Sequence, residues 1–390
     1  MKKIAIGQAG GPTTVINATL AGFVKEMTPD FSLFFIQNGY QGLVRGDLLE
    51  GNEENINWVL EHQNVPGACL GSGRYPFTDE KLEKAVQNLR QNSIEVLVFI
   101  GGNGTMEALN KVEKAAKDQG YDLQVIGLPK TVDNDLGCTD HAPGFGSSAR
   151  YVAQATRDIS RDLHAMRNFE QVRILETMGR NAGWLAAASG LLKTFEEEGP
   201  QFIGLPERPM KQLDLLSTVE DAIRKYGCAT VVISEGVKWS EGVQIQREEV
   251  NGRAVLGGIS GEVELFLKKE LNIMARSELL GINQRSSSQS VSNLDRYESF
   301  LTGITGGKWI KEGWSGIMVS MQRDDDIRYN VDMKPVQLED VVKAGERLMP
   351  AHFIDNRDRY YEWLLPLVGD ELPTYPPMIQ RRDLYVNQQN

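Results

Sequence analysis

The stretch Gly127-Leu-Pro-Lys-Thr-Val-Asp-Asn-Asp135 decides how the rest of the chain is interpreted. It follows a short apolar run, residues 123–126, that is typical of a buried strand. The stretch therefore places a lysine, a threonine and two aspartates on the loop that leaves the carboxyl end of a strand, where open α/β sheets bind their ligands. For Asp133-Asn-Asp135 alone, a turn that satisfies only its own backbone is the alternative interpretation.

The composition of the chain is typical of a globular protein, with 41% hydrophobic and 24% charged residues. A length of 390 residues predicts two or three domains. The formal net charge of −11 argues against a nucleic-acid partner, because nucleic-acid binding needs a basic surface. An acidic protein that handles phosphates must instead concentrate its arginines and lysines at the site.

The cysteines and the N-terminus indicate a cytoplasmic protein. Cys69, Cys138 and Cys228 form neither a Cys-x-x-Cys pair nor a disulfide framework, which is typical of a reducing compartment. The first residues enter an expected strand with no signal-peptide core before it. No apolar run approaches the ~18 residues of a membrane span. We therefore expect no membrane partner.

Apolar runs alternate with helical patterns along the chain. In the first part, the expected strands are residues 4–7, 32–36, 95–100 and 123–126, and the expected helices are 15–27, 82–89 and 106–117. In the second part, which begins near Ser147, the expected strands are 172–175, 201–205, 229–234 and 314–320, and the expected helices are 149–168, 184–192, 212–225 and 254–272. This alternation predicts an α/β fold with mostly parallel sheets.

Three glycine-rich loops share one form, in which glycines lie between an apolar run and a helix. They are Gly10-Gly11, Gly71-Ser-Gly-Arg74 and Gly101-Gly-Asn-Gly-Thr105. Glycine lets the backbone come close to a ligand, and a helix N-terminus offers free N–H groups to phosphate. Any one loop has a plain alternative, because tight turns need glycine anyway. Three together predict a polyphosphate site, and none fits the P-loop or dinucleotide-binding pattern.

The charged residues near these loops suit phosphoryl transfer. That reaction needs cations around the moving phosphoryl group, a metal ion, and an aligned hydroxyl with a proton acceptor. The candidate cations are Lys130, Arg180, Arg74 and Arg285, and the candidate carboxylates are Asp133 and Asp135. For each arginine, a surface salt bridge is the alternative.

Four motifs, in this order, resemble the phosphofructokinase family of ATP- and pyrophosphate-dependent enzymes: Gly101-Gly-Asn-Gly104, Pro129-Lys-Thr-Val-Asp-Asn-Asp135, Met178-Gly-Arg180 and Gln284-Arg285. The resemblance covers about residues 1 to 325. It implies two similar Rossmann-like α/β domains, each a mostly parallel sheet sandwiched by helices, with the active site in the cleft between them. It also implies a homo-oligomer that uses Mg²⁺ and transfers a donor's terminal phosphoryl group to the 1-hydroxyl of fructose 6-phosphate.

On this resemblance the chain divides into functional segments. Residues 1–145 are expected to bind the donor, ATP or pyrophosphate, and residues 146–283 the sugar phosphate. Residues 284–340 are expected to return to the donor domain, and residues 341–390 to form a C-terminal extension. Residues 355–390, at the end of this extension, are rich in Arg, Tyr and Pro and indicate no chemistry.

The resemblance also implies roles for residues on the donor side. Asp133 matches the family's proton acceptor, with Thr131 and Asp135 beside it. Lys130 matches the lysine that neutralises the leaving group in pyrophosphate users. The donor is expected to meet Gly11, Arg74, Gly102, Asn103, Gly104 and Thr105, with Asn103 and Asp135 as the candidate metal ligands.

On the acceptor side, the resemblance implies a loop for the sugar phosphate and the transferred phosphoryl group, made by Met178, Gly179 and Arg180. Glu235 is expected to hold sugar hydroxyls. Arg276 and Arg285 are expected to hold the sugar's own phosphate. The catalytic residues that the resemblance implies are Arg180 from this side and Lys130, Thr131 and Asp133 from the donor side.

Two positions bear on the donor. Pyrophosphate users in the family typically carry an aspartate at the position of Gly104, where its carboxylate takes the place of a nucleotide's α-phosphate. Gly104 removes that charge, so that ATP can fit. Lys130 is the residue of pyrophosphate users, but the pair Gly104 and Lys130 also occurs in ATP users. We therefore favour ATP as the donor and keep pyrophosphate as the alternative.

The acceptor side departs from the family pattern. The family often has His or Tyr where this chain has Ile282, and many members have an arginine where this chain has Gln171. Arg173, on the same face of the expected strand, is a candidate substitute. These changes open the choice of sugar phosphate, and with Asn103 they motivate a second alternative, a non-catalytic sensor of sugar phosphates or nucleotides. A sensor has little need, however, for a proton acceptor such as Asp133.

Overall fold

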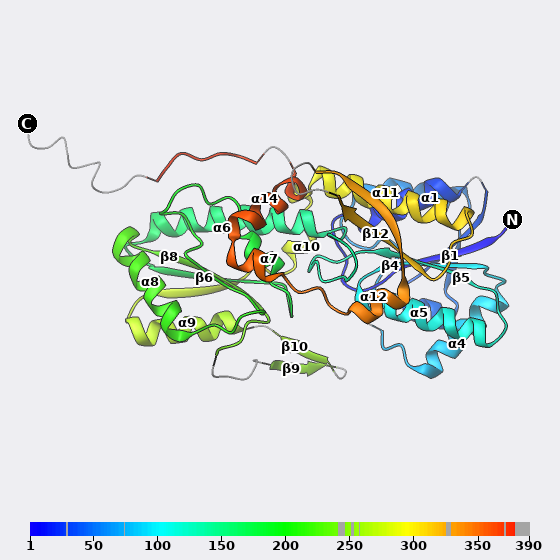
Figure 1. Ribbon diagram of the computed structural model, residues 1–390, viewed down its shortest axis with the longest axis horizontal. Coiled ribbons are helices and arrows are strands. Elements are labelled where there is room, and N and C mark those ends of the chain that lie inside the picture. Colours follow the sequence, from blue (N-terminus) through cyan, green and yellow to red (C-terminus); the bar gives the residue numbers. More distant parts are fainter. Residues whose placement is uncertain are drawn as a thin grey trace, which may run out of the picture. The chain divides into compact units, whose positions relative to one another are not determined.

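The chain divides into two compact units in the computed structural model (Figure 1), which describes residues 1–28, 30–73, 75–240, 246–250, 253–256, 258–324, 329–369 and 372–378. The first unit comprises Met1–Tyr151 and Ile282–Gly369, and the second comprises Val152–Gly281 and Asp370–Asn390. Among the described residues, no helix has both the length and the apolar character that a membrane crossing requires.

A seven-stranded sheet forms the centre of the first unit, in the order β13-β12-β5-β4-β1-β2-β3. The five inner strands run parallel, and β3 and β13 pair antiparallel at the two edges. The strands are β1 (Lys3–Gln8), β2 (Ser32–Ile36), β3 (Leu48–Glu50), β4 (Val96–Gly101), β5 (Gln124–Pro129), β12 (Ile317–Arg323) and β13 (Val331–Gln337).

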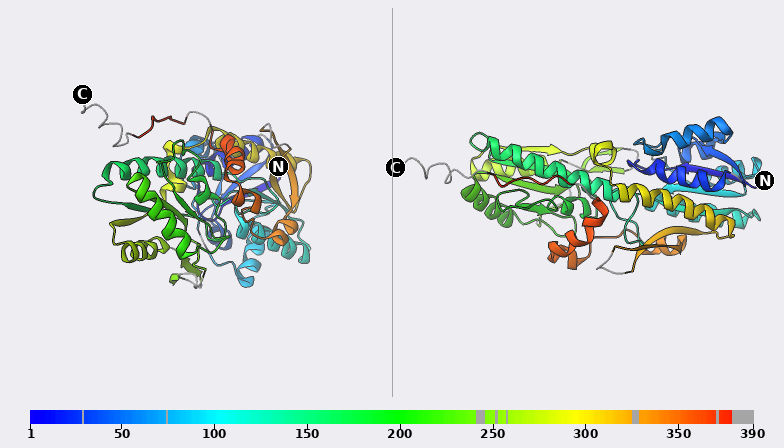
Figure 2. Two further views of the ribbon diagram at one scale, coloured as in Figure 1. Left: turned by 60° about the vertical axis from the view of Figure 1, so that its left-hand side comes forward. Right: turned by 90° about the horizontal axis from the view of Figure 1, so that it is seen from above.

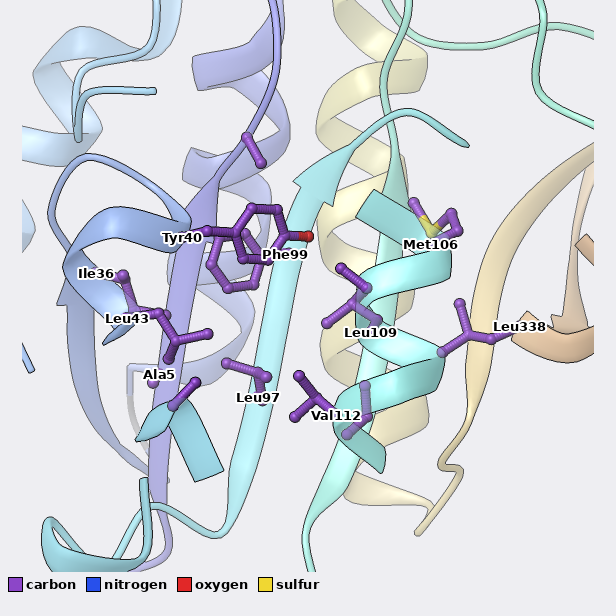
Figure 3. Packing of buried hydrophobic residues seen from close by; sticks show 14 of the residues in the cluster. Ala5, Ile36, Tyr40, Leu43, Leu97, Phe99, Met106, Leu109, Val112 and Leu338 are labelled. Carbon is purple, nitrogen blue, oxygen red and sulfur yellow. The ribbon is translucent and has the colours of Figure 1, made fainter. Parts of the chain in front are cut away.

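Alternate residues of the buried strands pack into two separate cores, one on each face of this sheet. In β4, Leu97 and Phe99 face one core, whereas Val96, Val98 and Ile100 face the other. Figure 3 shows the first core, where the ring of Phe99 stacks on Tyr40 with a centroid distance of 4.7 Å. Because both faces are buried, the strand has no polar side, which is typical of parallel sheets covered by helices.

The helices of the first unit lie on both faces of its sheet. Helices α2, α4, α5 and α12 contribute to the first core, and α1 and α11 to the second. Their bounds, with those of the remaining helices of this unit, are α1 (Ile16–Met27), α2 (Tyr40–Arg45), α3 (Glu53–Glu61), the 3-10 turn His62–Asn64, α4 (Asp79–Gln91), α5 (Asn103–Asp118), α10 (Asn283–Ser286), the 3-10 turn Ser288–Ser290, α11 (Asn293–Lys311), α12 (Leu338–Ala344), α13 (Ala351–Asp355) and α14 (Arg357–Val368).

Helices α1 and α11 lie side by side (Figure 2), and glycines let their backbones approach closely. A Cβ atom at Gly22 would lie 2.1 Å from the carbonyl oxygen of Phe300, and one at Gly303 would lie 2.0 Å from that of Thr19. Neither position therefore has room for a side chain, because the obstacle in each case is the backbone of the partner helix.

A four-stranded parallel sheet forms the centre of the second unit, in the order β11-β6-β8-β7. Helices α8 and α9 pack on one face through apolar side chains. The strands are β6 (Val172–Thr177), β7 (Phe202–Gly204), β8 (Ala229–Ser234) and β11 (Ala275–Leu279). The helices are α7 (Trp184–Ala188), α8 (Gln212–Tyr226), α9 (Ile259–Leu271) and α6 (Phe145–Met166), which begins in the first unit.

The predicted α/β class with mostly parallel sheets is confirmed, but the bounds of three elements differ from the prediction. The segment 254–272 is mostly helical, as expected, but its first residues are not, because Arg253–Leu256 forms β10, which pairs antiparallel with β9 (Gln246–Val250). Helix α9 starts only after Gly258, whose φ of 90° does not belong to a helix. Helix α7 ends at Ala188, before Gly190, instead of reaching residue 192. The strand expected over residues 314–320 is shifted to Ile317–Arg323.

Candidate functional site

Lys130 joins three loops of the first unit. It follows β5 directly, its backbone N–H donates to the carbonyl oxygen of Gly101 at 2.9 Å, and its Nζ donates to that of Gly11 at 2.7 Å. Only 4% of the residue is exposed. A buried ammonium group is costly unless it is hydrogen-bonded. The fold therefore holds this cation at a fixed place between the first and third glycine-rich loops.

The residues after Lys130 form a compact turn around Thr131. The Thr131 hydroxyl donates to the carboxylate of Asp135 at 2.9 Å and accepts from the backbone N–H of Asp133 at 3.1 Å. Burial raises the pKa of Asp135, an effect that the Thr131 hydrogen bond partly offsets. Asn134 has a φ of 52°, and its side-chain oxygen accepts from the backbone N–H of Ala142. The carboxylate of Asp135 thus shapes the turn, while Asp133 contributes its backbone N–H.

The first and second glycine-rich loops are hydrogen-bonded to each other beside a cavity. Ser72 donates from its hydroxyl to the carbonyl oxygen of Gly10 at 2.6 Å, and Gly10 donates to the carbonyl oxygen of Gly73 at 3.3 Å. The cavity measures about 360 Å³ and is lined by Gly10, Gly11, Pro12, Ala68, Ser72, Gly73 and Arg285.

Arg285, on α10, lies directly against this glycine loop. A Cβ atom at Gly11 would lie 2.4 Å from its Nη1, and a Cβ atom at Gly10 would lie 3.3 Å from Nζ of Lys130. Two cations therefore flank the two glycines, and any larger residue in their place would push into the cations. A backbone-lined cavity with flanking positive charge suits an anionic ligand.

The third glycine-rich loop starts helix α5. Gly102 is the residue before the first turn, and Thr105 and Met106 donate their N–H groups back to its carbonyl oxygen. A Cβ atom at Gly104 would meet no atom within 4 Å, so the loop is open at this position. The N-terminus of a 16-residue helix carries partial positive charge, which favours a phosphate group.

The two predicted metal ligands lie together. Asn103 donates from Nδ2 to the backbone carbonyl oxygen of Asp135 at 2.9 Å. Among the described residues, no group of three or more His, Cys, Asp and Glu side chains is arranged to hold a metal ion. One carboxylate with a neighbouring amide oxygen still fits Mg²⁺, which usually binds through one or two carboxylates together with substrate phosphates and water.

In the second unit, Met178, Gly179 and Arg180 follow β6, and Glu235 follows β8. These two strands are neighbours in the sheet (Figure 1). Glu235 donates its backbone N–H to the carbonyl oxygen of Thr177 at 2.9 Å, and Ser234 donates from its hydroxyl to the carbonyl oxygen of Gly179. Gly179 has a φ of 125°, a conformation that favours glycine. These two hydrogen bonds therefore hold both loops at the carboxyl ends of the two neighbouring strands.

Arg276 lies on β11 beside Arg173 of β6, and the two residues are direct partners in the strand pairing. Glu170 binds both arginines, with 2.6 Å between its Oε1 and Nε of Arg173 and 3.4 Å between its Oε2 and Nε of Arg276. Glu278 accepts a further hydrogen bond from Arg173. Arg173, the candidate substitute for the missing arginine, is therefore paired with two carboxylates.

The structure thus groups the predicted site residues by unit. The first unit brings together the loops that carry Gly11, Gly102, Asn103, Gly104, Thr105, Lys130, Thr131, Asp133, Asp135 and Arg285. The second unit carries Met178, Gly179, Arg180, Glu235 and Arg276. Arg285, which the resemblance assigns to the sugar's phosphate, lines the same cavity as Gly11. Arg74 lies outside the described residues.

A buried polar network behind the Lys130 loop was not predicted. His141 shares short polar contacts with Asp140 (Nδ1, 2.8 Å) and with Glu298 on α11 (Nε2, 2.9 Å), and Tyr329 donates to Glu298. Asp295, one turn earlier on α11, accepts from the backbone N–H groups of Gly144 and Ser147. The adjacent Asp140 and His141 were the only signal in the sequence, because their partners lie far along the chain.

A family model described as Phosphofructokinase matches residues 3–329. The chain belongs to the phosphofructokinase family.

Relatives of this phosphofructokinase-family chain span nearly its whole length. A sulfofructose kinase from Alkalicoccus urumqiensis is 46% identical to it over 93% of this chain and 94% of its own. A pyrophosphate–fructose 6-phosphate 1-phosphotransferase from Xanthomonas campestris pv. campestris is 32% identical over 94% of this chain and 91% of its own. The crystal structure of the pyrophosphate-dependent phosphofructokinase from Marinobacter aquaeolei has a TM-score of 0.84 and 29% identity, covering 97% of this chain and 94% of that one.

These findings confirm the predicted family, the fold class and the class of enzyme. This member of the phosphofructokinase family is a phosphotransferase. Its named relatives differ in acceptor, and only some of their names state a donor, so the family alone leaves both substrates open.

Proposed function

We propose that this protein transfers the terminal phosphoryl group of ATP to the 1-hydroxyl of sulfofructose, a fructose that carries a sulfo group. The main support for this choice of acceptor is the 46% identity to a sulfofructose kinase across nearly the whole of both chains. The departures at Gln171 and Ile282 support it, because both lie where the family's phosphate-binding residues would be expected. Fructose 6-phosphate is the second candidate acceptor, favoured by the 32% identical relative.

The choice of ATP rests on the open space at Gly104. A nucleotide is larger than pyrophosphate, and a Cβ atom at this position would meet no atom within 4 Å. The helix N-terminus at Asn103 and the cavity beside Gly11 supply further room for phosphate groups. Pyrophosphate is the alternative donor, supported by Lys130 and by the relatives named for it.

In the proposed reaction, the glycine-rich loops of the first unit bind the donor, and Met178, Gly179 and Glu235 of the second unit bind the acceptor. Lys130 would neutralise charge on the leaving group, and Arg180 charge on the transferred phosphoryl group. Asp133, close to Lys130 in the same turn, would accept the proton of the sugar hydroxyl. Thr131 would hold the turn through its bonds to Asp133 and Asp135.

Mg²⁺ is the cofactor that this proposal requires. Asp135 and Asn103 would hold it together with the donor phosphates, because these two residues are joined by a hydrogen bond. When bound, Mg²⁺ would neutralise charge on the phosphate oxygens. The raised pKa of Asp135 fits this role, since burial disfavours an unaccompanied carboxylate and a bound cation would relieve that cost.

The test is a matrix of two donors and two acceptors with the purified full-length protein. Steady-state kcat/KM would be measured for sulfofructose and fructose 6-phosphate, each with ATP and with pyrophosphate, in the presence of Mg²⁺. We expect the highest value for ATP with sulfofructose. An equal or higher kcat/KM with fructose 6-phosphate would contradict the proposed acceptor. An equal or higher kcat/KM with pyrophosphate would contradict the proposed donor. Ligand binding without turnover in any combination would favour the sensor.

The resemblance adds two expectations about the setting of this reaction. We propose that the protein acts as a homo-oligomer, because family members place their sites near subunit contacts, and that it works in the cytoplasm. Light scattering of the purified protein gives its mass directly, and a monomer at micromolar concentration would contradict the first expectation. Fractionation of the source cells would test the second.

A further inference from the structure

Glu170 sits between two arginines at the start of β6. It is 2% exposed, whereas the side chain of Arg276 is 55% exposed. One carboxylate oxygen is 2.6 Å from Nε of Arg173 and the other is 3.4 Å from Nε of Arg276. A buried carboxylate therefore directs its charge at an arginine whose remaining surface is open to a ligand.

Arg173 is fully committed to this cluster. Burial alone would lower its pKa, but the hydrogen bond and charge of Glu170, together with Glu278, raise it above the ordinary value. Arg173 therefore stays charged and paired. The two arginines carry no excess positive charge, because Asp162 adds its negative charge to those of Glu170 and Glu278 around Arg173. The buried position of Glu170 limits the screening that weakens surface pairs.

Gln171 adds no charge to this region. Its side-chain oxygen accepts from the backbone N–H of Met274 at 3.1 Å, and its Nε2 donates to the carbonyl oxygen of Arg167 at 3.1 Å. The amide therefore bridges the backbone just after α6 and the backbone just before β11. An arginine here would bring a cation, whereas the glutamine serves the packing of the two strands.

A cluster without excess positive charge can distinguish acceptors by the charge that they carry. A phosphate monoester carries about −1.5 to −2 charges at pH 7, because its second pKa is near 6. A sulfonate is the anion of a strong acid and carries a single charge. An anion with two charges gains most from unneutralised cations and is repelled most by a nearby carboxylate.

We infer that Glu170 determines acceptor specificity, by lowering the positive charge at Arg276 so that a singly charged sulfonate is favoured over a doubly charged phosphate. This inference rests on the proposed function and on the role that the resemblance implies for Arg276, which is to hold the anionic group of the acceptor. Glu170 acts through Arg276 and Arg173 and needs no contact with the acceptor.

The test is the Glu170→Gln variant of the full-length protein, assayed with both acceptors at saturating ATP. We expect the ratio of kcat/KM for sulfofructose to that for fructose 6-phosphate to fall by about tenfold, since one unit of charge is removed a few ångströms from the anion. The change should lie in the KM for fructose 6-phosphate, which should fall. A purely structural role would instead lower kcat/KM for both acceptors together.

Two further variants keep this test decisive. Glu270→Gln, in the exposed pair with Lys269 of the same unit, is the matched control and should leave the ratio unchanged. Because Glu170→Gln strands the charge of buried Arg173, the double variant Glu170→Gln/Arg173→Met removes the pair together. It should shift the ratio in the same direction but by less, because the net charge of the cluster stays the same while Arg276 still loses its carboxylate partner.

The outcomes separate this inference from the function on which it rests. An unchanged ratio in the folded single and double variants would overturn the role of Glu170, while the wild-type preference for sulfofructose would still stand. A wild-type protein that does not phosphorylate sulfofructose would overturn the proposed function, and the inference with it.

Discussion

Lys130 donates a hydrogen bond from Nζ to the carbonyl oxygen of Gly11 at 2.7 Å, although 119 residues separate them in the sequence. The bond joins the loop after β5 to the loop after β1, two strands that are separated by β4 in the sheet. It places the ammonium group beside the glycine-lined cavity that also meets Arg285. The site is thus assembled from parallel strand ends, with one lysine fixing the distance between two loops.

Replacing Lys130 by methionine removes this charge and keeps most of the side-chain volume. We expect kcat/KM for ATP to fall by about 10²–10³-fold, the usual effect of losing one preorganised donor to a developing charge. Steady-state kinetics with varied ATP would measure it. Lys111→Met is the control, because Lys111 makes only an exposed helix pair with Glu107. A fall of less than tenfold would contradict the proposed role of the lysine.

Replacing Asp133 by alanine removes the proposed proton acceptor. We expect kcat to fall by about 10²–10⁴-fold, with little change in the KM for the acceptor, because the base acts at the chemical step. The turn should persist, since Thr131 and Asp135 bond to each other independently of the Asp133 carboxylate. Asp122→Ala, at an exposed position, is the control. An unchanged kcat would exclude Asp133 as the base.

Replacing Gly104 by aspartate tests where the nucleotide lies. The fold should accept the change, because no atom lies within 4 Å of the new Cβ, so the melting temperature should stay close to that of the wild type. The added carboxylate should lower kcat/KM for ATP by at least an order of magnitude, since like charges a few ångströms apart repel. Gly261→Asp, another open helical position, is the control. ATP kinetics that do not change would show that the donor lies elsewhere.

The His141 network predicts how stability depends on pH. Burial alone would lower the pKa of His141, but Glu298 and Asp140 raise it from 6.5 to about 9. Although burial opposes it, His141 and Arg323 lower the pKa of Asp140 from 3.8 to about 2. The histidine's contribution is present below pH 6.5 and is lost as the pH rises through 9. The contribution of Asp140 is present above pH 3.8 and is lost as the pH falls through 2.

Replacing His141 by asparagine should remove the loss of stability between pH 6.5 and 9. Urea unfolding across this range would measure it, with a wild-type change on the order of 2 kcal/mol. The neighbours of His141 in this network are Asp140, Glu298, Tyr329 and, through Asp140, Arg323. Exposed His352→Asn is the control. The same pH dependence in the wild type and the His141 variant would refute the role of this histidine.

The fold was predictable where a segment's own residues determine its structure. The inner strands are continuous apolar runs because both faces of the parallel sheets are covered, and this pattern is visible in the sequence. Continuous apolar runs do not identify the strands outside the centres of the two sheets. Strand β13 contains Pro335, which a strand tolerates at the edge of a sheet, and β10 lies within a segment that has helical spacing.

The site was predictable as motifs but not as contacts. Thr131 and Asp135 are four residues apart, so their bond belongs to a local turn. The contact between Lys130 and Gly11, and the pairing of Glu170 with Arg276, depend on which strands become neighbours, which the sequence does not state. The roles of the site residues stay predictions, among them that of Arg285.

The backbone contact between α1 and α11 has a mechanical consequence. Helix α1 follows the Gly10–Gly11 loop, and α11 carries Asp295 and Glu298, which hold the segment after the Lys130 turn. With no side chains at Gly22 and Gly303 to reorient, the two helices can slide past each other only by breaking carbonyl contacts. We therefore expect the two helices to move as one rigid body during turnover. Any movement that admits the substrate should then occur in the loops at their ends.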